Sequence, residues 1–246
     1  LVETRHHRLL YDTGPLYSTE SNGGNRVILP YLRARGIEKL DGIIVSHSDV
    51  DHAGGALAIL DAVKAGWVVS SLWLDHPIVK AAPSHRRCMD GQGWSWDGIR
   101  FEMVHPTVES YADASLKANA RSCTLRITSG SHSILLAGDI EAAQEAQLLA
   151  RRANGLRSHV LLAPHHGSGT SSTPAFLAGV SPEVALFQVG YRNRYRHPKA
   201  EVIQRYEDMG VQRLRTDESG AVTFRFGAKV EASRYRREHA RYWHLR

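Results

Sequence analysis

Cysteine is scarce in this chain of 246 residues, because only Cys88 and Cys123 are present and they lack the CxxC spacing of a zinc site. So few cysteines exclude a disulfide framework of the kind that holds small secreted domains together. The chain also lacks any run of about 18 apolar residues that could span a bilayer, and no charged-then-apolar leader begins it. We therefore interpret the chain as a soluble body and, because it starts at Leu1 without Met, as a piece of a longer protein.

The basic residues are unevenly spread. Lys and Arg outnumber Asp and Glu by 31 to 25, and the excess concentrates in residues 191–199 and 233–246. A polyanionic partner is one interpretation of such patches. For residues 233–246 a solvated basic end explains the sequence equally well. At this length the chain fits one large domain or two small ones.

The stretch SHSDVDHAGG, residues 46–55, gathers four possible metal ligands within six positions: His47, Asp49, Asp51 and His52. A short β-branched run at residues 40–45 predicts a strand before it, and the continuation GGALAILDAVKAG predicts a helix after it. The cluster is therefore expected on a strand-to-helix loop. Alternate side chains of such a loop can point at one metal while the adjacent Asp51 and His52 point at a second.

Two further apolar runs end in similar side chains. The predicted hairpin at residues 122–140 ends at Asp139, and the apolar run before PHHGS ends at His165 and His166. Near the N-terminus a predicted hairpin ends at Asp12. Two metal ions held about 3.5 to 4 Å apart activate a bridging water and stabilise both oxygens of an in-line displacement, so hydrolysis of a phosphodiester or an acyl group is the expected chemistry.

Together, YDTG, the HSDVDH run, LLAGD and PHHGS resemble the metallo-β-lactamase superfamily through nearly the whole chain. The resemblance implies an α+β sandwich, the four-layer αββα metallo-β-lactamase fold, with a dinuclear centre between the sheet edges. We assign this domain to residues 1–230 and a basic C-terminal tail to residues 231–246. In that family the run is usually H-x-H-x-D-H, and a separate His precedes the GD aspartate. Here Asp49 replaces the second His, and Asn119 and Ser122 stand where the separate His is expected.

The departures are informative, because SHxDxDHxGG, NxxSC, LLAGDIE, PHHGS and a late N-x-Y-x-HP element resemble the soluble domain of the ComEC family of competence DNA-uptake proteins. The resemblance implies a metal-dependent nuclease attached to a membrane channel, on the outer face of the cytoplasmic membrane. Its partners would be that channel and single-stranded DNA. It would degrade the strand that is not transported during natural transformation.

The same resemblance assigns roles residue by residue. Metal ligands are His47, Asp49, Asp51, His52, Asp139 and one of the pair His165 and His166. Asp12, Asn119 and Ser122 would contact and orient the ligands. Asp51 and His197 are the catalytic candidates, with His197 in proton transfer to the leaving group or in phosphate contact. The DNA backbone would be held by Arg192, Asn193, Arg194, Tyr195, Arg196 and Lys199.

A carboxylate in place of an imidazole moves a site towards the oxygen-rich pattern that suits Mn²⁺ or Mg²⁺. We therefore expect two divalent ions, with Mn²⁺ favoured and Zn²⁺ second. The extracytoplasmic placement that the resemblance implies would also allow a disulfide between Cys88 and Cys123.

Two other functions fit the same residues. The absence of the separate His also fits a catalytically silent DNA-binding or gating module of the same channel, in which the altered first site holds one structural metal or none. A small-molecule lactonase or thioesterase would use the same scaffold, although the basic loop and PHHGS favour DNA over a small-molecule substrate.

Overall fold

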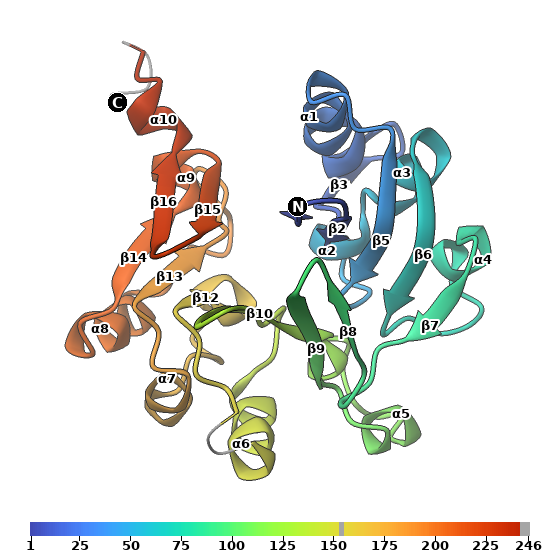
Figure 1. The fold of residues 1–246 in the computed structure, drawn as a ribbon. Coiled ribbons are helices and arrows are strands. Elements are labelled where there is room, and N and C mark those ends of the chain that lie inside the picture. The colour runs from blue at the N-terminus through green and yellow to red at the C-terminus, as the bar shows by residue number, and fades with distance from the viewer. Residues whose placement is uncertain (153–154, 242–246) are drawn as a thin grey trace. The chain divides into compact units, whose positions relative to one another are not determined.

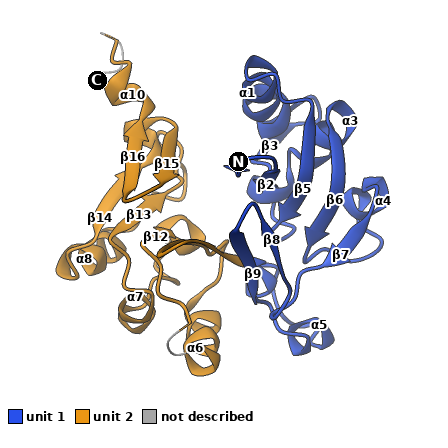
Figure 2. Cartoon of the chain, viewed as in Figure 1, with its two compact units in different colours: residues 1–124 blue, residues 125–246 orange. Residues whose placement is uncertain are grey.

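The computed structural model describes residues 1–152 and 155–241. The chain forms two compact units, Leu1–Thr124 and Leu125–Arg246 (Figures 1 and 2). Two units of this size agree with the expectation from length that the chain fits one large domain or two small ones.

Unit 1 is organised around a mainly parallel sheet of five strands. The strand order is β1-β2-β5-β6-β7, in which only the hairpin β1–β2 is antiparallel. These strands are β1 (Val2–Glu3), β2 (Arg8–Tyr11), β5 (Lys39–Val45), β6 (Lys64–Ser70) and β7 (His85–Arg87). Two small antiparallel pairs complete the strands of this unit, β3 (Leu16–Ser18) with β4 (Ser21–Asn22) and β8 (Gly93–Trp96) with β9 (Ile99–His105).

The helices of unit 1 are short and cover the apolar strands. They are the π-helix η1 (Gly24–Ile28), α1 (Leu29–Ala34), α2 (Val50–Ala53), α3 (Ala56–Ala62), α4 (Pro77–Ala81), α5 (Glu109–Ala112) and the 3-10 helix η2 (Asn119–Arg121). Strand β5 is buried over Ile43, Ile44 and Val45, as expected for a strand covered on both faces. Leu32 of α1 and Ile59 of α3 join the same core. Burial of β5 fixes the position of the residues that follow it, Ser46 and His47.

The helix predicted to run through Gly66 is shorter than expected. It ends at Ala62, and Lys64 already pairs with Lys39 in the β5–β6 ladder. Val63 adopts an extended conformation between the two elements. The ladder with β5 outweighs the helical preference of the following Lys and Ala, so β6 begins inside the stretch predicted to be helical.

Unit 2 contains a five-strand run in the order β10-β11-β12-β13-β14. Strands β10 (Thr124–Ser129) and β11 (His132–Leu136) form the predicted hairpin, and β12 (Val160–Leu162), β13 (Val184–Phe187) and β14 (Gln212–Arg215) follow in parallel. The helices are α6 (Ala142–Arg151), the 3-10 helix η3 (Pro164–Gly167), α7 (Pro174–Val180), α8 (Ala200–Asp208), α9 (Thr216–Ser219) and α10 (Tyr235–Glu238). Because parallel strands end at one edge, the segments after β11 and β12 lie together.

Part of the stretch predicted as a basic tail forms regular structure at the end of unit 2. Strand β15 (Val222–Phe226) pairs with β16 (Val230–Arg234), and α10 follows directly. Residues 230–238, most of them within the predicted basic tail, therefore form a strand and a helix. The last residues of that predicted tail, 242–246, lie outside the described residues.

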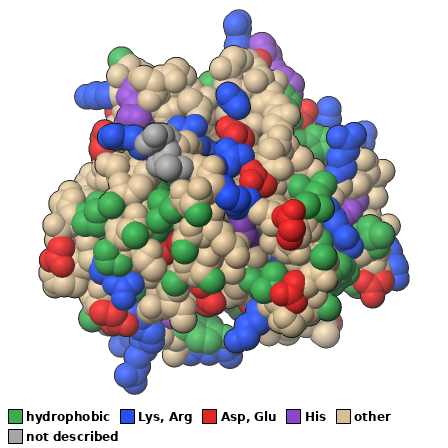
Figure 3. Space-filling view, turned by 90° about the horizontal axis from the view of Figure 1, so that it is seen from below, with side chains coloured by type: hydrophobic (Ala, Val, Ile, Leu, Met, Phe, Trp, Pro, Cys, Tyr) green, Lys and Arg blue, Asp and Glu red, His purple; other side chains and the backbone are tan. Residues whose placement is uncertain are grey.

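No helix in the described ranges is both long and apolar enough to cross a membrane. The net charge of the sequence is +6. On the face drawn in Figure 3, Lys and Arg side chains are interspersed with Asp and Glu. On this face the positive charge is not gathered into one broad patch, so individual groups of arginines carry more information about ligands than the net charge does.

Candidate metal centre

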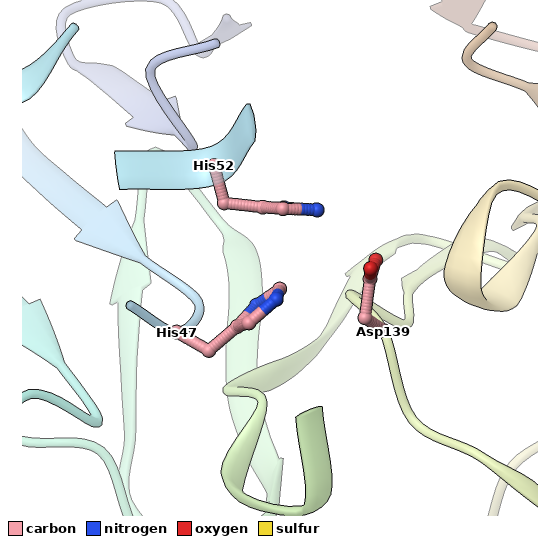
Figure 4. Close-up of side chains that lie close together, drawn as sticks. All are labelled: His47, His52 and Asp139. Carbon is pink, nitrogen blue, oxygen red and sulfur yellow. The ribbon is translucent and has the colours of Figure 1, made fainter. Parts of the chain in front are cut away.

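The SHSDVDH motif leaves the buried end of β5 and turns at once into α2. His47 is fully buried and His52 nearly so, and their rings lie 4.2 Å apart between centroids (Figure 4). Asp49 begins α2 as its N-cap, with an extended backbone. The sequence prediction of a strand-to-helix loop is confirmed at this point.

Both histidines of unit 1 are held through the same nitrogen. Nδ1 of His52 lies 2.7 Å from Oδ2 of Asp12, and Nδ1 of His47 lies 2.9 Å from the hydroxyl of Ser46. Ser46 also donates its backbone N–H and its hydroxyl to the Asp12 carboxylate, at 2.7 and 2.9 Å. Metal-binding histidines usually have one ring nitrogen held in this way by a protein oxygen, which directs the other nitrogen to the ion.

The remaining nitrogens of these rings face carboxylates. Nε2 of His47 lies 3.7 Å from Oδ2 of Asp49, and Nε2 of His52 lies 3.9 Å from Oδ2 of Asp51. The two Asp side chains are about half exposed, whereas the two rings are buried. Unit 1 thus presents two imidazole nitrogens and two carboxylates on one side of the loop.

Asp12 reaches this site because the chain directly after it packs closely on Gly54 and Gly55, which follow α2. Asp12 has a positive φ of 58°, and its N–H donates to the carbonyl of Ile44 at 2.8 Å. A Cβ atom on Gly55 would collide with the Thr13 carbonyl, and one on Gly54 would collide with the backbone at Leu16. The glycine pair therefore allows the Asp12 segment to approach the metal motif.

Ser122 contacts the motif from the other side. Its hydroxyl lies 3.3 Å from Nδ1 of His47, while its backbone N–H donates to the carbonyl of Asn119. The next residue, Cys123, donates its N–H to the Ser46 carbonyl at 2.9 Å. Its sulfur lies 2.01 Å from that of Cys88, at disulfide bonding distance. Ser122 thus supports the ring of His47, as expected of a residue that orients a ligand.

In unit 2 three candidate ligands gather at the ends of β11 and β12. Nε2 of His165 and Nε2 of His166 each lie 3.6 Å from a different oxygen of Asp139. The N–H of His165 donates to the carbonyl of Gly138 at 3.0 Å, which joins the two strand ends. Figure 4 shows the Asp139 carboxylate on the segment after its strand. Both histidines remain possible ligands by this geometry.

His165 has the same kind of support as the histidines of unit 1. Its Nδ1 lies 3.2 Å from the Glu141 carboxylate and 3.3 Å from the Thr170 hydroxyl, which itself donates to Glu141 at 2.8 Å. Both His165 and His166 have positive φ angles, 47° and 54°, which direct the two adjacent rings to the same carboxylate. Such left-handed backbone is uncommon outside glycine.

The late N-x-Y-x-HP element positions His197. Asn193 accepts from the His197 N–H at 2.8 Å and donates to its carbonyl at 2.7 Å. The His197 ring lies 5.9 Å from that of His165 and stacks on Tyr195 at 5.8 Å. Burial, followed by the neighbouring His165 and Lys199 charges, lowers the pKa of His197, so the ring is neutral at pH 7.

The basic side chains of this loop are partly engaged with its own aromatics. Arg192 lies over the Tyr191 ring, and Arg194 lies over the Tyr195 ring and donates to its hydroxyl. Lys199 donates to the Tyr195 carbonyl at 2.9 Å. Arg196, like Arg192, has a positive φ. The DNA-contact role of these residues stays a prediction.

Sequence reasoning missed two residues that complete this site. Ser46 bonds both Asp12 and His47, and Glu141 bonds His165. Both stand inside motifs that were recognised, SHSDVDH and LLAGDIE, but a lone Ser or Glu beside a ligand has no spacing of its own that signals its role.

These residues fit divalent metal ions within each unit. Three histidines have Nδ1 held by protein oxygens, and their Nε2 atoms face carboxylates of Asp49, Asp51 and Asp139. Imidazole nitrogens bind Zn²⁺ and Fe²⁺ well, and carboxylate oxygens shift the preference towards Mn²⁺. The donor set therefore supports a metal centre without selecting the metal.

Comparison with known proteins identifies the class. A family model described as "Metallo-beta-lactamase superfamily" matches residues 1–190, so the chain belongs to this superfamily of metal-dependent hydrolases. The metallo-beta-lactamase fold protein YhfI from Bacillus subtilis aligns with a TM-score of 0.53 over 94% of this chain and 89% of that one, at 12% identity. This likeness shows the fold alone. The predicted α+β metallo-β-lactamase fold is thereby confirmed.

The curated relatives narrow the family further. Competence protein ComA of Neisseria gonorrhoeae is 37% identical over 237 residues, which cover 96% of this chain and 32% of ComA. The uncharacterized protein YcaI of Escherichia coli is 36% identical over 90% of this chain and 28% of YcaI. These are names of the ComEC family, so the predicted resemblance is confirmed. The chain spans about a third or less of the length of these relatives.

Proposed function

We propose that this chain is the metal-dependent DNA nuclease domain of a DNA-uptake channel and that it degrades the strand that is not transported. The histidine geometry carries the metal part of the proposal, because Nδ1 of His47 and of His52 is held by protein oxygens while Nε2 faces a carboxylate. The competence name of ComA, a relative at 37% identity, supports DNA as the substrate.

In this proposal the predicted ligands bind two divalent ions, as the superfamily membership supports. His47, Asp49, Asp51 and His52 come from unit 1, and Asp139 with His165 or His166 comes from unit 2. When bound, the ions supply Lewis-acid stabilisation of the phosphoryl oxygens and lower the pKa of the attacking water. Mn²⁺ is favoured over Zn²⁺ because Asp49 adds a carboxylate oxygen.

The chain's own residues then position the substrate and handle protons. Two hydrogen bonds to Asn193 fix the backbone of His197, so its ring is positioned to contact the phosphate or to pass a proton to the leaving oxygen. The arginines of the loop at residues 191–199 hold the phosphodiester backbone. Such contacts make DNA binding weaken as salt rises.

We further propose that the domain lies on the extracytoplasmic side of the cytoplasmic membrane, attached to the channel portion of its parent chain. The Cys88–Cys123 disulfide supports this placement, since disulfides persist in oxidising compartments.

The decisive experiment compares cleavage of labelled single-stranded DNA by wild type and by Asp51→Ala, each with added Mn²⁺. We expect the variant to lose activity by about a hundredfold or more, as removal of a group that stabilises transition-state charge does. Asp61→Ala is the matched control, because Asp61 is an exposed acid on α3 in the same unit. Wild-type cleavage by Asp51→Ala would refute the metal centre as the catalyst.

One observation favours a second candidate, a catalytically silent DNA-binding or gating module. Ser122 stands in the stretch where the superfamily usually has a metal-binding histidine. Its hydroxyl contacts Nδ1 of His47, so it orients a ligand but is not itself an imidazole ligand. Counting bound metal ions and assaying cleavage in the same preparation separates the two functions. DNA binding with fewer than two ions and no cleavage would select the silent module.

A further inference from the structure

Unit 1 contains a hollow beside the metal motif that the proposed ligands do not occupy. It is lined by Ser48, Ser71, Leu72, Trp73, His76, Ala118 and Arg121. The space free of protein atoms is about 260 Å³, including the part open to solvent. Because part of this space is open to solvent, a phosphate can enter the hollow while the attached sugar and base stay at its mouth.

The hollow adjoins the metal motif directly through the chain. Ser48 follows His47, and Arg121 precedes Ser122, whose hydroxyl contacts the His47 ring. The sulfurs of Cys88 and Cys123 join the segment of Arg87 to the segment of Arg121. A group bound in the hollow would therefore lie next to the first metal ligands of unit 1.

Arg121 is the main sign that the hollow binds an anion. Only 8% of this residue is exposed, yet it forms no salt bridge with any carboxylate of the described residues. One of its five N–H donors bonds the Asp113 carbonyl at 3.3 Å. The Asp113 carboxylate senses the guanidinium charge but is itself exposed and bonds Ser115. A buried guanidinium without an acid partner is costly, and a bound phosphate would supply the missing charge.

Two positively charged guanidinium groups pack on the aromatic wall of the hollow. The guanidinium carbons of Arg87 and Arg121 lie 4.8 and 5.1 Å from the centre of the Trp73 ring. Arg87 also lies 5.0 Å from the Tyr111 ring and forms no salt bridge with a described acid. Cation–π contacts orient guanidinium groups without neutralising them. Trp73 remains 39% exposed and offers an apolar surface beside two cations.

His76 supplies a further donor. Its Nδ1 accepts a hydrogen bond from the Ile78 N–H at 3.2 Å, and burial lowers the pKa of the ring. The neutral ring therefore carries its proton on Nε2. With the exposed hydroxyl of Ser48, the hollow combines one buried cation, two neutral donors and an indole.

We propose that this hollow binds one nucleotide of single-stranded DNA, with its phosphate on Arg121, His76 and Ser48 and its sugar and base against Trp73. The site rests on the proposed function, because it would hold the nucleotide that flanks the cleaved phosphodiester. Its chemistry differs from that of the metal ligands, so its failure can be distinguished from that of the nuclease.

The test measures binding of labelled oligothymidylate by fluorescence anisotropy, with EDTA present to prevent cleavage, over a range of salt concentrations. Arg121→Gln is compared with wild type, with Arg121→Lys and with Arg86→Gln. Arg86 is the matched control because it neighbours Arg87 on β7 and its side chain is exposed. Thermal unfolding of each variant checks that it folds.

We expect Arg121→Gln to weaken binding about tenfold or more and to reduce the slope of log affinity against log salt by about 0.7, the value for one phosphate contact on a single strand. Arg121→Lys should restore most of the slope, and Arg86→Gln should leave affinity near wild type. In a second arm, Trp73→Ala should bind oligothymidylate about tenfold more weakly but bind an abasic strand nearly as well as wild type does.

Each outcome decides between the two proposals. Equal salt slopes and affinities for wild type, Arg121→Gln and Trp73→Ala overturn the nucleotide site, while metal-dependent cleavage by wild type leaves the nuclease standing. Dependence on Arg121 and Trp73 without any cleavage supports the site and refutes the nuclease. Absence of DNA binding by wild type overturns the site as well. If Arg121→Gln does not fold, the Trp73→Ala arm decides.

Discussion

Oδ2 of Asp12 lies 2.7 Å from Nδ1 of His52, a residue 40 positions further along the chain. The same carboxylate accepts two hydrogen bonds from Ser46, which in turn contacts His47. One acid near the N-terminus therefore orients both histidines of unit 1.

This relationship predicts that Asp12→Asn lowers metal affinity by about 10- to 100-fold, the usual cost of losing such a supporting partner. Both carboxylate oxygens of Asp12 accept hydrogen bonds. The NH₂ group of an asparagine cannot accept one, so it would face the N–H of Ser46 or of His52 without bonding it. Calorimetric Mn²⁺ titration measures the effect. Asp61→Asn, an exposed acid on α3, is the control and should bind metal normally. Unchanged Mn²⁺ affinity in Asp12→Asn would remove Asp12 from the site.

The identity of residue 49 predicts the metal preference. Asp49→His would replace a carboxylate oxygen by an imidazole nitrogen beside Nε2 of His47. The ratio of Mn²⁺-supported to Zn²⁺-supported cleavage should then fall by about tenfold, since nitrogen-rich sites favour Zn²⁺. Metal titrations of activity in metal-stripped wild type and variant measure this ratio. A ratio that does not change would show that Asp49 does not set the preference.

The Cys88–Cys123 contact predicts a measurable share of the stability. A bond across 35 residues should contribute about 3 to 4 kcal/mol by restricting the unfolded chain. We expect the free energy of unfolding of the double variant Cys88→Ala/Cys123→Ala, measured by urea denaturation, to be lower by that amount. Thiol titration of denatured, unreduced wild type should find no free thiol. Two titratable thiols would contradict the disulfide.

A cluster away from the metal motif predicts acid sensitivity. Asp97 accepts from the Thr4 hydroxyl and from the backbone of His6, and these hydrogen bonds lower the pKa of Asp97. A carboxyl whose folded pKa is lowered stabilises the protein above its unfolded pKa, about 3.9, and this stabilisation is lost as pH falls towards the folded pKa. Asp97→Asn should therefore be less stable than wild type at pH 7, and the difference should shrink below about pH 4.

Urea unfolding of Asp97→Asn and wild type between pH 7 and pH 3 tests this expectation. Asp61→Asn again serves as control, because Asp61 forms no hydrogen bond or salt bridge with the described residues. A stability difference that stays constant across this pH range would show that Asp97 acts through packing rather than through its charge.

Local patterns were sufficient to predict the elements that present the ligands. The β-branched run before His47 and the apolar run before His165 both form strands, and both clusters follow those strands directly. The hairpin before Asp139 was predicted for the same reason. Alternation and turn residues act over a few positions, so a single sequence contains the information for such elements.

Contacts between distant segments could not be predicted in this way. The Trp73 ring meets Arg87 and Arg121, which come from segments far apart in the chain, and no spacing links the three residues. Most of β16 lies in the stretch that its basic composition predicts to be a tail. It forms a strand through its pairing with β15, which propensity alone does not indicate.

Gly54 and Gly55 have no side chain with which to bind a metal or a substrate. A side chain at either position would nevertheless displace the backbone of residues 13–16. That backbone directly continues from Asp12, so such a displacement would separate the carboxylate from the imidazole it holds. In a deep mutational scan, both glycines would rank with the metal ligands in sensitivity. Loss of activity on substitution of either glycine would then result from the displaced backbone and not from the loss of a chemical group.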